Sequence, residues 1–270
     1  MKYYLYNSLA NNGIKPKLEQ GIELVNAVGL DYAAYLKGLA PDDEIVLIGG
    51  DGTLNYFINA VKGCDIKNNV YLLGCGSGND FLRDIGEEPG KEVLINSYLT
   101  NLPTVYVNGK ERLFINNMGF GIDGYCCEVA DRTKIAYPGK EIDYSGIAIK
   151  GLLFHFKTSH AVITVDGEKH EFDHVWIAPT MNGRYYGGGM KMAPGQNRSS
   201  GKLTVVVYHT RSKLKALMAF PSIFKGEHIQ KTDLVSVFTG NDISVSFSRP
   251  CAAQIDGETV LNVSEYRARL

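Results

Sequence analysis

The stretch that most constrains the fold of this chain is IVLIGGDGTLN, at residues 45–55. Its first four residues are apolar and mostly β-branched, which predicts a buried strand. A glycine turn at a helix N-terminus is suited to bind an anion, because backbone N–H groups can approach the ligand and the helix dipole favours negative charge. The glycines here predict such a turn, and the apolar side of the helix that follows is formed by Leu54, Phe57, Ile58 and Val61.

Asp51 lies inside this glycine turn, where its carboxylate would repel a bare phosphate. A carboxylate is expected there if a cation lies between it and the phosphate, or if it accepts a proton or a hydrogen bond. A simpler interpretation is a strand-to-helix turn in which Asp51 or Thr53 caps the helix. The stretch alone does not decide between the two, because short glycine motifs have low specificity.

A second unit of the same kind follows. Residues 70–73 (VYLL) predict a short strand, and residues 74–81 are GCGSGNDF. Two strands about two dozen residues apart, each ending in a glycine loop, are typical of neighbours in a parallel sheet. Their loops would then meet at the carboxyl edge of that sheet, where open α/β sheets bind ligands.

The pair GGDGTLN and GSGNDF resembles the diacylglycerol kinase catalytic domain family, which includes lipid kinases and sphingosine kinases. The first motif alone is also similar to that of NAD kinases and, more distantly, of phosphofructokinases. The resemblance implies an ATP-dependent kinase that uses Mg²⁺, with ATP over both loops in a cleft between two domains. The residues implied to bind the nucleotide are Gly49, Gly50, Asp51, Gly52, Thr53, Gly76, Ser77, Gly78 and Asn79.

The first expected strand is formed by residues 2–6, and the loop that follows it resembles the family less closely. Family members have an Asn-Pro-x-Ser-Gly type of loop at this place, where it helps to hold the nucleotide. Asn7 fits that pattern, whereas Ser8, Ala10 and Asn11 do not. We therefore carry over Asn7 alone as a nucleotide-binding residue.

Hydrophobic periodicity predicts an α/β arrangement for the first hundred residues. Around the strands already named, we expect helices at 17–28, 31–39, 81–84 and 91–99. From Pro103 on, short stretches rich in β-branched and aromatic residues dominate, which is typical of an antiparallel sandwich. We expect these strands at 104–107, 113–116, 161–165, 174–178, 203–208, 243–247, 252–255 and 259–263, with one helix at 144–156.

These patterns predict two domains in the 270 residues. The first, at 1–102, is a nucleotide-binding α/β domain of the NAD kinase/diacylglycerol kinase type, with a parallel-type sheet. The second, at 103–270, is a mainly antiparallel β-sandwich substrate domain whose C-terminal tail has room to return to the first domain. No low-complexity linker separates them, which indicates close packing. Edge strands of the second domain leave room for a homodimer.

Three segments of the second domain extend the resemblance in the family's order: FINNMGFGID at 114–123, NGRYYGGGMKMAP at 182–194 and IDGE at 255–258. Taken singly, each has a simpler explanation, because Asn-Gly, Gly-Gly-Gly and Asp-Gly are common turns. The family implies that Glu258 is the base for the acceptor hydroxyl, with Asp51 as the competing candidate. Asp51 is also the expected Mg²⁺ ligand, together with the nucleotide phosphates. Folding must then bring residue 258 to the glycine loops.

One position departs from the family. Where lipid kinases usually have Asp-Gly ahead of a strand, this chain has Ser200-Gly201, followed by Lys202. In bacterial members that Asp belongs to a second magnesium site, away from the phosphates. A hydroxyl is a poor substitute for a carboxylate on a hard dication, so we predict that this structural site is absent or weak at Ser200.

Charge and composition restrict the partners. The chain has 28 Lys and Arg against 29 Asp and Glu, which does not favour nucleic acid. No apolar run reaches the roughly 18 residues of a transmembrane helix, and the five cysteines lack metal-type spacing. We therefore expect a cytoplasmic protein in transient, peripheral contact with the membrane. Residues 211–220, basic at one end and apolar at the other, would either touch the bilayer or cover the sandwich.

The resulting hypothesis is an ATP-dependent lipid kinase that transfers the γ-phosphate to a hydroxyl of a diacylglycerol-like lipid. One alternative is an NAD-kinase-like enzyme, against which the GSGNDF and Asp-Gly-Glu segments argue. Another is a nucleotide-binding regulatory protein with lost or altered catalysis. The diluted loop at Asn7 and the missing carboxylate at Ser200 favour this second alternative.

Overall fold

The structure, a computed structural model, describes residues 1–8, 22–76 and 78–270. The chain divides into two compact units, Met1–Leu102 and Pro103–Leu270. The prediction for Ser77 lies outside the described residues, as does the part of the expected 17–28 helix before residue 22.

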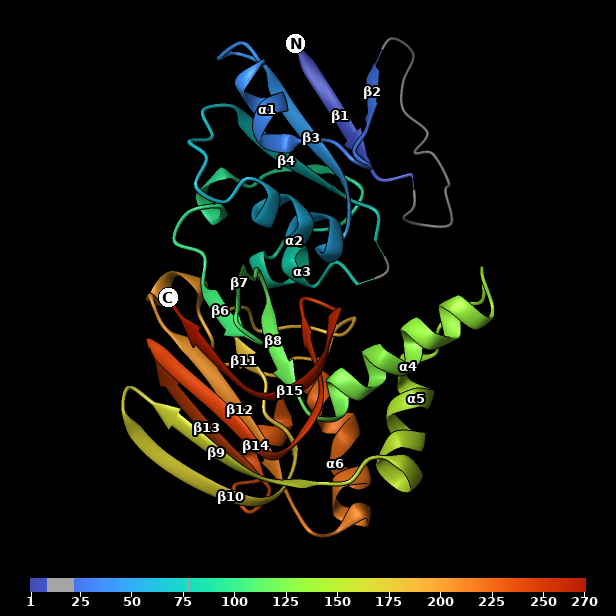
Figure 1. The fold of residues 1–270 in the computed structure, drawn as a ribbon, viewed down its shortest axis with the longest axis vertical. Helices are drawn as coiled ribbons and strands as arrows, with labels where there is room; N and C mark the ends of the chain where they lie inside the picture. Colours follow the sequence, from blue (N-terminus) through green and yellow to red (C-terminus); the bar gives the residue numbers. More distant parts are fainter. Residues whose placement is uncertain (9–21, 77) are drawn as a thin grey trace. The chain divides into compact units, whose positions relative to one another are not determined.

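The first unit is built on a five-stranded sheet in the order β2-β1-β3-β4-β5 (Figure 1). The first four strands are parallel, and β5 is antiparallel to β4. The strands are β1 (Lys2–Tyr6), β2 (Glu23–Asn26), β3 (Glu44–Gly49), β4 (Asn69–Gly74) and β5 (Glu92–Leu94). The helices are α1 (Tyr32–Lys37), α2 (Asp51–Ala60) and α3 (Asp80–Ile85), and a 3₁₀ turn covers Asn96–Tyr98.

The centre of this sheet follows the sequence prediction. The side chains of residues 45–48 in β3 are at most 4 % exposed, as expected for a central parallel strand that is covered on both faces. Leu54, Phe57 and Ile58 of α2 are buried, so the predicted apolar side of that helix does face the protein interior. The predicted strand–glycine turn–helix units at β3 and β4 are therefore confirmed.

The helix expected at 17–28 is wrong over its described part, because Glu23–Asn26 forms β2. Tyr4 of β1 pairs with Leu24, and the side chains of Ile22 and Leu24 pack on the tyrosines of β1. The spacing of Leu18, Ile22 and Val25 fits a helix, but pairing with an available strand edge overrides this local pattern.

The helix expected at 91–99 is also wrong, because β5 and the 3₁₀ turn occupy this segment. Glu92 accepts a hydrogen bond from the Lys2 ammonium at 2.8 Å and one from the Tyr4 hydroxyl at 2.5 Å. The Asn96 side chain accepts a hydrogen bond from the Val70 N–H at 2.8 Å. These bonds to β1 and β4 hold the segment extended against the sheet.

The second unit is a ten-stranded antiparallel sheet that closes on itself. Its order is β7-β6-β15-β14-β8-β11-β12-β10-β9; β13 pairs with β12, and β14 also pairs with β9. The strands are β6 (Thr104–Val107), β7 (Lys110–Leu113), β8 (Asn117–Phe120), β9 (Ser159–Val165), β10 (Glu168–Ile177), β11 (Thr180–Met181), β12 (Leu203–His209), β13 (Val235–Gly240), β14 (Asp242–Ile255) and β15 (Glu258–Arg269). This arrangement confirms the predicted α/β plus antiparallel β-sandwich fold class.

Three helices accompany this sheet: α4 (Ile122–Ala136), α5 (Tyr144–Lys150) and α6 (Lys213–Lys225). A π-helical turn, Gly151–His155, continues α5, so the helix predicted at 144–156 is confirmed. No described helix is both long and apolar enough to cross a bilayer.

The second unit corrects three details of the sequence analysis. Residues 114–116 lie between β7 and β8 rather than in a strand, and the strands expected at 243–247 and 252–255 are parts of the single strand β14. Helix α4 was not predicted. A Cβ added to Gly124 would lie 2.1 Å from the Ala252 carbonyl oxygen, so α4 lies directly on β14 through a glycine. Such a contact between distant segments leaves no periodic signal in the sequence.

Candidate active site

The two glycine loops meet at the carboxyl edge of the first sheet, as predicted. Gly49 at the end of β3 pairs with Gly74 at the end of β4. The N–H of Cys75 continues this pairing by donating to the Gly49 carbonyl at 3.0 Å. Asn7 follows β1, whose last residue Tyr6 pairs with Ile48, so Asn7 lies at the same edge.

The backbones of the two loops touch. A Cβ added to Gly76 would lie 2.6 Å from the Gly50 Cα, and one added to Gly50 would lie 2.9 Å from the Gly76 Cα. A Cβ on Gly49 would overlap the side chain of Thr53, at 2.0 Å from its hydroxyl oxygen. Glycine is therefore required at these positions for packing within the protein. Gly52 differs, because no atom of the described residues lies within 4 Å of its added Cβ.

Asp51 joins the two loops. Its carboxylate accepts hydrogen bonds from the N–H groups of Asp80 at 2.9 Å and Phe81 at 2.8 Å, in the first turn of α3. The expectation that Asp51 or Thr53 caps its own helix is wrong, since the N-cap of α2 is Gly50 and no side chain caps the helix there. Asp51 instead satisfies the orphan N–H groups of the neighbouring helix, which fixes one loop against the other.

Asn79 carries a buried acceptor that no described group satisfies. Its Nδ2 donates to the Gly76 carbonyl at 2.6 Å, which fixes the orientation of the side-chain amide. Its Oδ1 is buried and has no hydrogen-bond partner among the described residues. Asn79 has a left-handed backbone, with φ of 48°, which turns the chain into α3. A buried orphan oxygen beside two glycine loops is suited to accept a hydrogen bond from a ligand.

These features fit a bound nucleotide. The uncapped N-terminus of the ten-residue α2 presents the first-turn N–H groups of residues 51–53 and the positive end of the helix dipole. The open space at Gly52 lets a phosphate approach this backbone. Among the described residues, no three His, Cys, Asp or Glu side chains gather as a metal site. A Mg²⁺ ion here would therefore need nucleotide phosphates as further ligands beside Asp51.

In the second unit, the Asp256-Gly257 turn joins β14 to β15 as a two-residue hairpin, with Ile255 opposite Glu258. Both turn residues have positive φ, 47° and 90°, which is typical of such hairpins. The buried Asp256 carboxylate accepts hydrogen bonds from three successive N–H groups, those of residues 115, 116 and 117, at 2.6, 2.8 and 2.9 Å. Asp256 is thus a structural anchor that holds the hairpin carrying Glu258.

The same segment, residues 115–117, also binds the predicted motif at 182–194. The Asn182 side chain donates to the Ile115 carbonyl at 2.9 Å, and the Asn182 N–H donates to the Asn116 carbonyl at 2.8 Å. Arg198 donates to the same Ile115 carbonyl and to the Asn116 side-chain oxygen, the latter at 2.6 Å. Three motifs that lie far apart in sequence therefore converge on one loop.

Arg198 was not predicted as part of a site. It lies in a 3₁₀ turn, Arg198–Ser200, within a polar stretch that has no distinctive sequence pattern. The same turn carries Ser200, whose exposed hydroxyl accepts a hydrogen bond from the Lys202 N–H at 3.2 Å. The weak or absent magnesium site at Ser200 stays a prediction.

Glu258 is exposed at the start of β15, and the groups behind it are buried. The Gln254 side chain accepts a hydrogen bond from the Gly257 N–H at 2.7 Å and donates to the Asp123 carboxylate at 3.3 Å. Burial raises the pKa of Asp123 to about 6, against the hydrogen bonds from the Gly124 N–H and Gln254. Asp123 and Gln254 therefore support the turn that positions Glu258. The predicted approach of Glu258 to the glycine loops stays a prediction.

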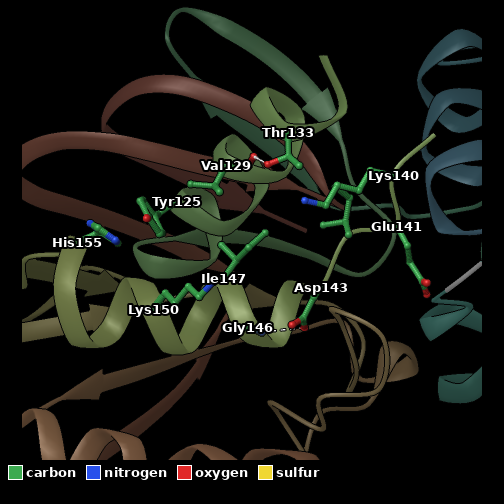
Figure 2. A pocket seen from close by; sticks show the side chains of 11 residues that line it. Tyr125, Val129, Thr133, Lys140, Glu141, Asp143, Gly146, Ile147, Lys150 and His155 are labelled. Carbon is green, nitrogen blue, oxygen red and sulfur yellow. Dashed lines mark hydrogen bonds between the residues drawn. The ribbon is translucent and has the colours of Figure 1, made fainter. Parts of the chain in front are cut away.

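A cavity of about 330 Å³ lies between α4 and the segment formed by α5 and the π-helical turn. Figure 2 shows Tyr125 and Val129 of α4 on one side of it and Ile147 of α5 on the other. Charged side chains, among them Lys140 and Lys150, also line it. The cavity thus combines apolar side chains with both basic and acidic ones, Glu141 and Asp143 being the acidic ones.

Two family models match this chain. The model of the YegS C-terminal NAD kinase beta sandwich-like domain matches residues 116–266, and that of the diacylglycerol kinase catalytic domain matches residues 14–103. This chain belongs to the family of the YegS C-terminal NAD kinase beta sandwich-like domain, and its first part matches the diacylglycerol kinase catalytic domain. The resemblance inferred from the two glycine motifs is thereby confirmed.

Two relatives are similar to this chain over most of its length, and one solved structure shares its fold. A diacylglycerol kinase of Mycobacterium tuberculosis is 26 % identical over 237 residues, which cover 82 % of this chain and 74 % of that protein. A diacylglycerol kinase of Bacillus subtilis is 25 % identical over 236 residues, covering 84 % and 75 %. A crystal structure of a diacylglycerol kinase from Bacillus anthracis shares the fold with a TM-score of 0.66 at 20 % identity, covering 99 % of this chain and 93 % of that one.

The loop contact predicts opposite effects for two glycine substitutions. Gly76→Ala forces the two loops apart and should lower the free energy of unfolding by about 2 kcal/mol. Gly52→Ala, in open space within α2, should raise it by about 0.5–1 kcal/mol because alanine favours the helix. Denaturant unfolding of both variants measures this. Equal stability of Gly76→Ala and the wild type would contradict the contact.

The buried Asp123 predicts a pH dependence of stability. Folding raises the pKa of Asp123, so its protonated carboxyl stabilises the folded state at low pH. This stabilisation is lost as the pH rises from about 4 to about 6. Asp123→Asn should remove this loss and raise the free energy of unfolding near neutral pH by about 3 kcal/mol. Urea unfolding at about pH 5 and about pH 7.5 tests this. Asp65→Asn, at an exposed carboxylate, is the control. A variant less stable than wild type at both pH values would refute the assignment.

Proposed function

We propose that this chain is an ATP-dependent kinase that transfers the γ-phosphate to a hydroxyl of a diacylglycerol-like lipid. The observation that carries the proposal is the contact of two glycine loops, held by the bonds from α3 to the Asp51 carboxylate. This contact places an uncapped helix N-terminus beside a second glycine loop, which suits the phosphates of a nucleotide. Relatives with the names of diacylglycerol kinases support the choice of acceptor class.

The nucleotide phosphates would be held by the first turn of α2 and by the glycine loop before α3. Asn79 Oδ1, which is buried without a described partner, would accept a hydrogen bond from a hydroxyl or amino group of the nucleotide and not from a phosphate. Bound Mg²⁺ would supply neutralisation of the phosphate charge, with Asp51 orienting it directly or through water. Both carboxylate oxygens of Asp51 accept backbone N–H groups, which favours an orienting role over that of a base.

Glu258 would accept the proton of the acceptor hydroxyl. Its side chain is exposed, whereas the turn that carries it is fixed by Asp256 and by Gln254. A base must be held in one place to act within hydrogen-bond reach of its substrate, and these buried bonds provide that constraint.

An acyl chain of the acceptor would lie in the cavity between α4 and α5. Val129 and Ile147 give this cavity apolar sides, and Tyr125 adds an aromatic surface. Lys140 and Lys150 line the same cavity and would lie near the polar end of a lipid. A nucleotide-binding regulator without turnover is the second candidate, favoured by a serine at position 200 where the family usually has a carboxylate.

Two substitutions should separate binding from chemistry. Glu258→Gln should lower kcat by roughly a hundredfold or more while ATP affinity stays unchanged, because only the base is removed. Asp51→Asn should lower both kcat and ATP affinity, because an amide NH₂ would face the N–H of Asp80 or Phe81. Glu265→Gln, at another exposed carboxylate of β15, is the matched control.

The assay follows labelled γ-phosphate from Mg-ATP into an organic-extractable product, in mixed micelles with a panel of lipid alcohols. Label in a lipid product that is lost with Glu258→Gln supports the proposal. Equal labelling by all variants would remove both carboxylates from the mechanism. ATP binding without labelling of any lipid would replace the proposal with the non-catalytic regulator.

A further inference from the structure

Helix α6 and the π-helical turn after α5 lie side by side in the second unit (Figure 1). The Lys213 ammonium at the start of α6 donates to the Leu153 carbonyl in the turn at 2.6 Å. This bond brings together two segments about 60 residues apart, 144–157 and 211–225. We call the solvent-facing side of these two segments the basic-apolar face.

Six large apolar side chains of the two segments are exposed to solvent: Tyr144, Ile149, Phe154, Leu214, Met218 and Phe224. Phe154 in the π-helical turn is 74 % exposed, and Leu214 and Met218 of α6 are 65 % and 72 % exposed. Leu214 and Met218 are four residues apart and so lie on one side of α6. The side of α6 that faces the protein is already formed by Ala216, Ala219 and Ile223, which are buried. The expectation that residues 211–220 cover the sandwich is thus met by one side of α6 only.

The charged side chains inside the two segments are all basic, whereas Asp143 caps the start of α5 just outside them. The two segments contain no Asp or Glu, although the chain as a whole has 29 acidic against 28 basic residues. Asp233, from outside the segments, lies 3.5 Å from the ammonium of Lys215. The basic residues in the two segments are Lys150, Lys157, Arg211, Lys213, Lys215 and Lys225.

We propose that the basic-apolar face docks on the surface of a bilayer that contains anionic phospholipid. Exposed apolar side chains at a helix surface insert at the headgroup boundary, and surrounding lysines and arginines are attracted to anionic headgroups. Phe154, Leu214 and Met218 supply the first contribution, and the basic residues of the two segments supply the second. Lys150 also lines the cavity between α4 and α5, so the docked face adjoins the proposed acyl site.

Docking needs no phosphate transfer, so it is tested without nucleotide and separately from the kinase reaction. The full chain is sedimented with vesicles of phosphatidylcholine and phosphatidylglycerol, and with vesicles of phosphatidylcholine alone. Binding to the mixed vesicles should exceed binding to the neutral ones by tenfold or more, because several basic residues contribute. Equal or absent binding to both kinds of vesicle would overturn the proposal.

Two sets of variants locate the surface. Leu214→Glu with Met218→Glu should lower binding to the mixed vesicles at least tenfold, whereas Val237→Glu with Leu261→Glu, at exposed apolar positions of β13 and β15, should not. Unchanged thermal unfolding of each variant shows that the fold is retained. Loss of binding in the control pair alone, or in neither pair, would contradict this location.

The charged variants are designed in the same way. Lys157→Gln, Arg211→Gln and Lys225→Gln together should lower binding to the mixed vesicles at least tenfold. The matched control replaces Lys67, Lys91 and Lys110, which are exposed elsewhere, and should bind like the wild type. An equal effect of both triple variants would show that net charge, rather than this face, governs binding, and would overturn the proposal.

Discussion

The two hydrogen bonds from the N–H groups of Asp80 and Phe81 to the Asp51 carboxylate hold the first unit's site together. They tie the start of α2 to the start of α3, at 2.9 and 2.8 Å, across the point where Gly50 and Gly76 touch. Because Asp51 caps the neighbouring helix, the N-terminus of α2 stays without a side-chain cap. The carboxylate inside this glycine loop therefore has a structural role, in addition to the proposed role of orienting a cation.

The second unit uses the same physical device. The buried Asp256 carboxylate accepts three successive N–H groups of residues 115–117, where it holds the hairpin of Glu258. Asn182 and Arg198 bind the same segment from other parts of the chain. In both units, the aspartate of a predicted motif accepts hydrogen bonds from backbone N–H groups and so fixes the position of that backbone. The residue close to this aspartate in the chain, Gly52 in one unit and Glu258 in the other, is exposed to solvent.

The sequence was informative where the structure depends on neighbouring residues. The glycine loops, their parallel strands and the 144–156 helix follow from local periodicity and turn chemistry, and the structure contains them. The helix expected at 17–28 failed because strand pairing with β1 overrides a helical spacing. Arg198 and Asp123 were missed as site residues because their partners, Asn116 and Gln254, are more than 80 residues away in the chain. Residues so far apart in the chain come together only in the folded sheet, so no local sequence pattern reveals the contact.

The central claim is that nucleotide phosphates lie against the two glycine loops held by Asp51. The most direct measurement is a titration of ¹⁵N-labelled protein with Mg-ATP, followed through the backbone amide signals. The account predicts the largest shifts at Gly50, Gly52, Gly76 and Gly78, with loss of these shifts in Asp51→Asn. Shifts that cluster elsewhere while these four amide signals stay unchanged would contradict it.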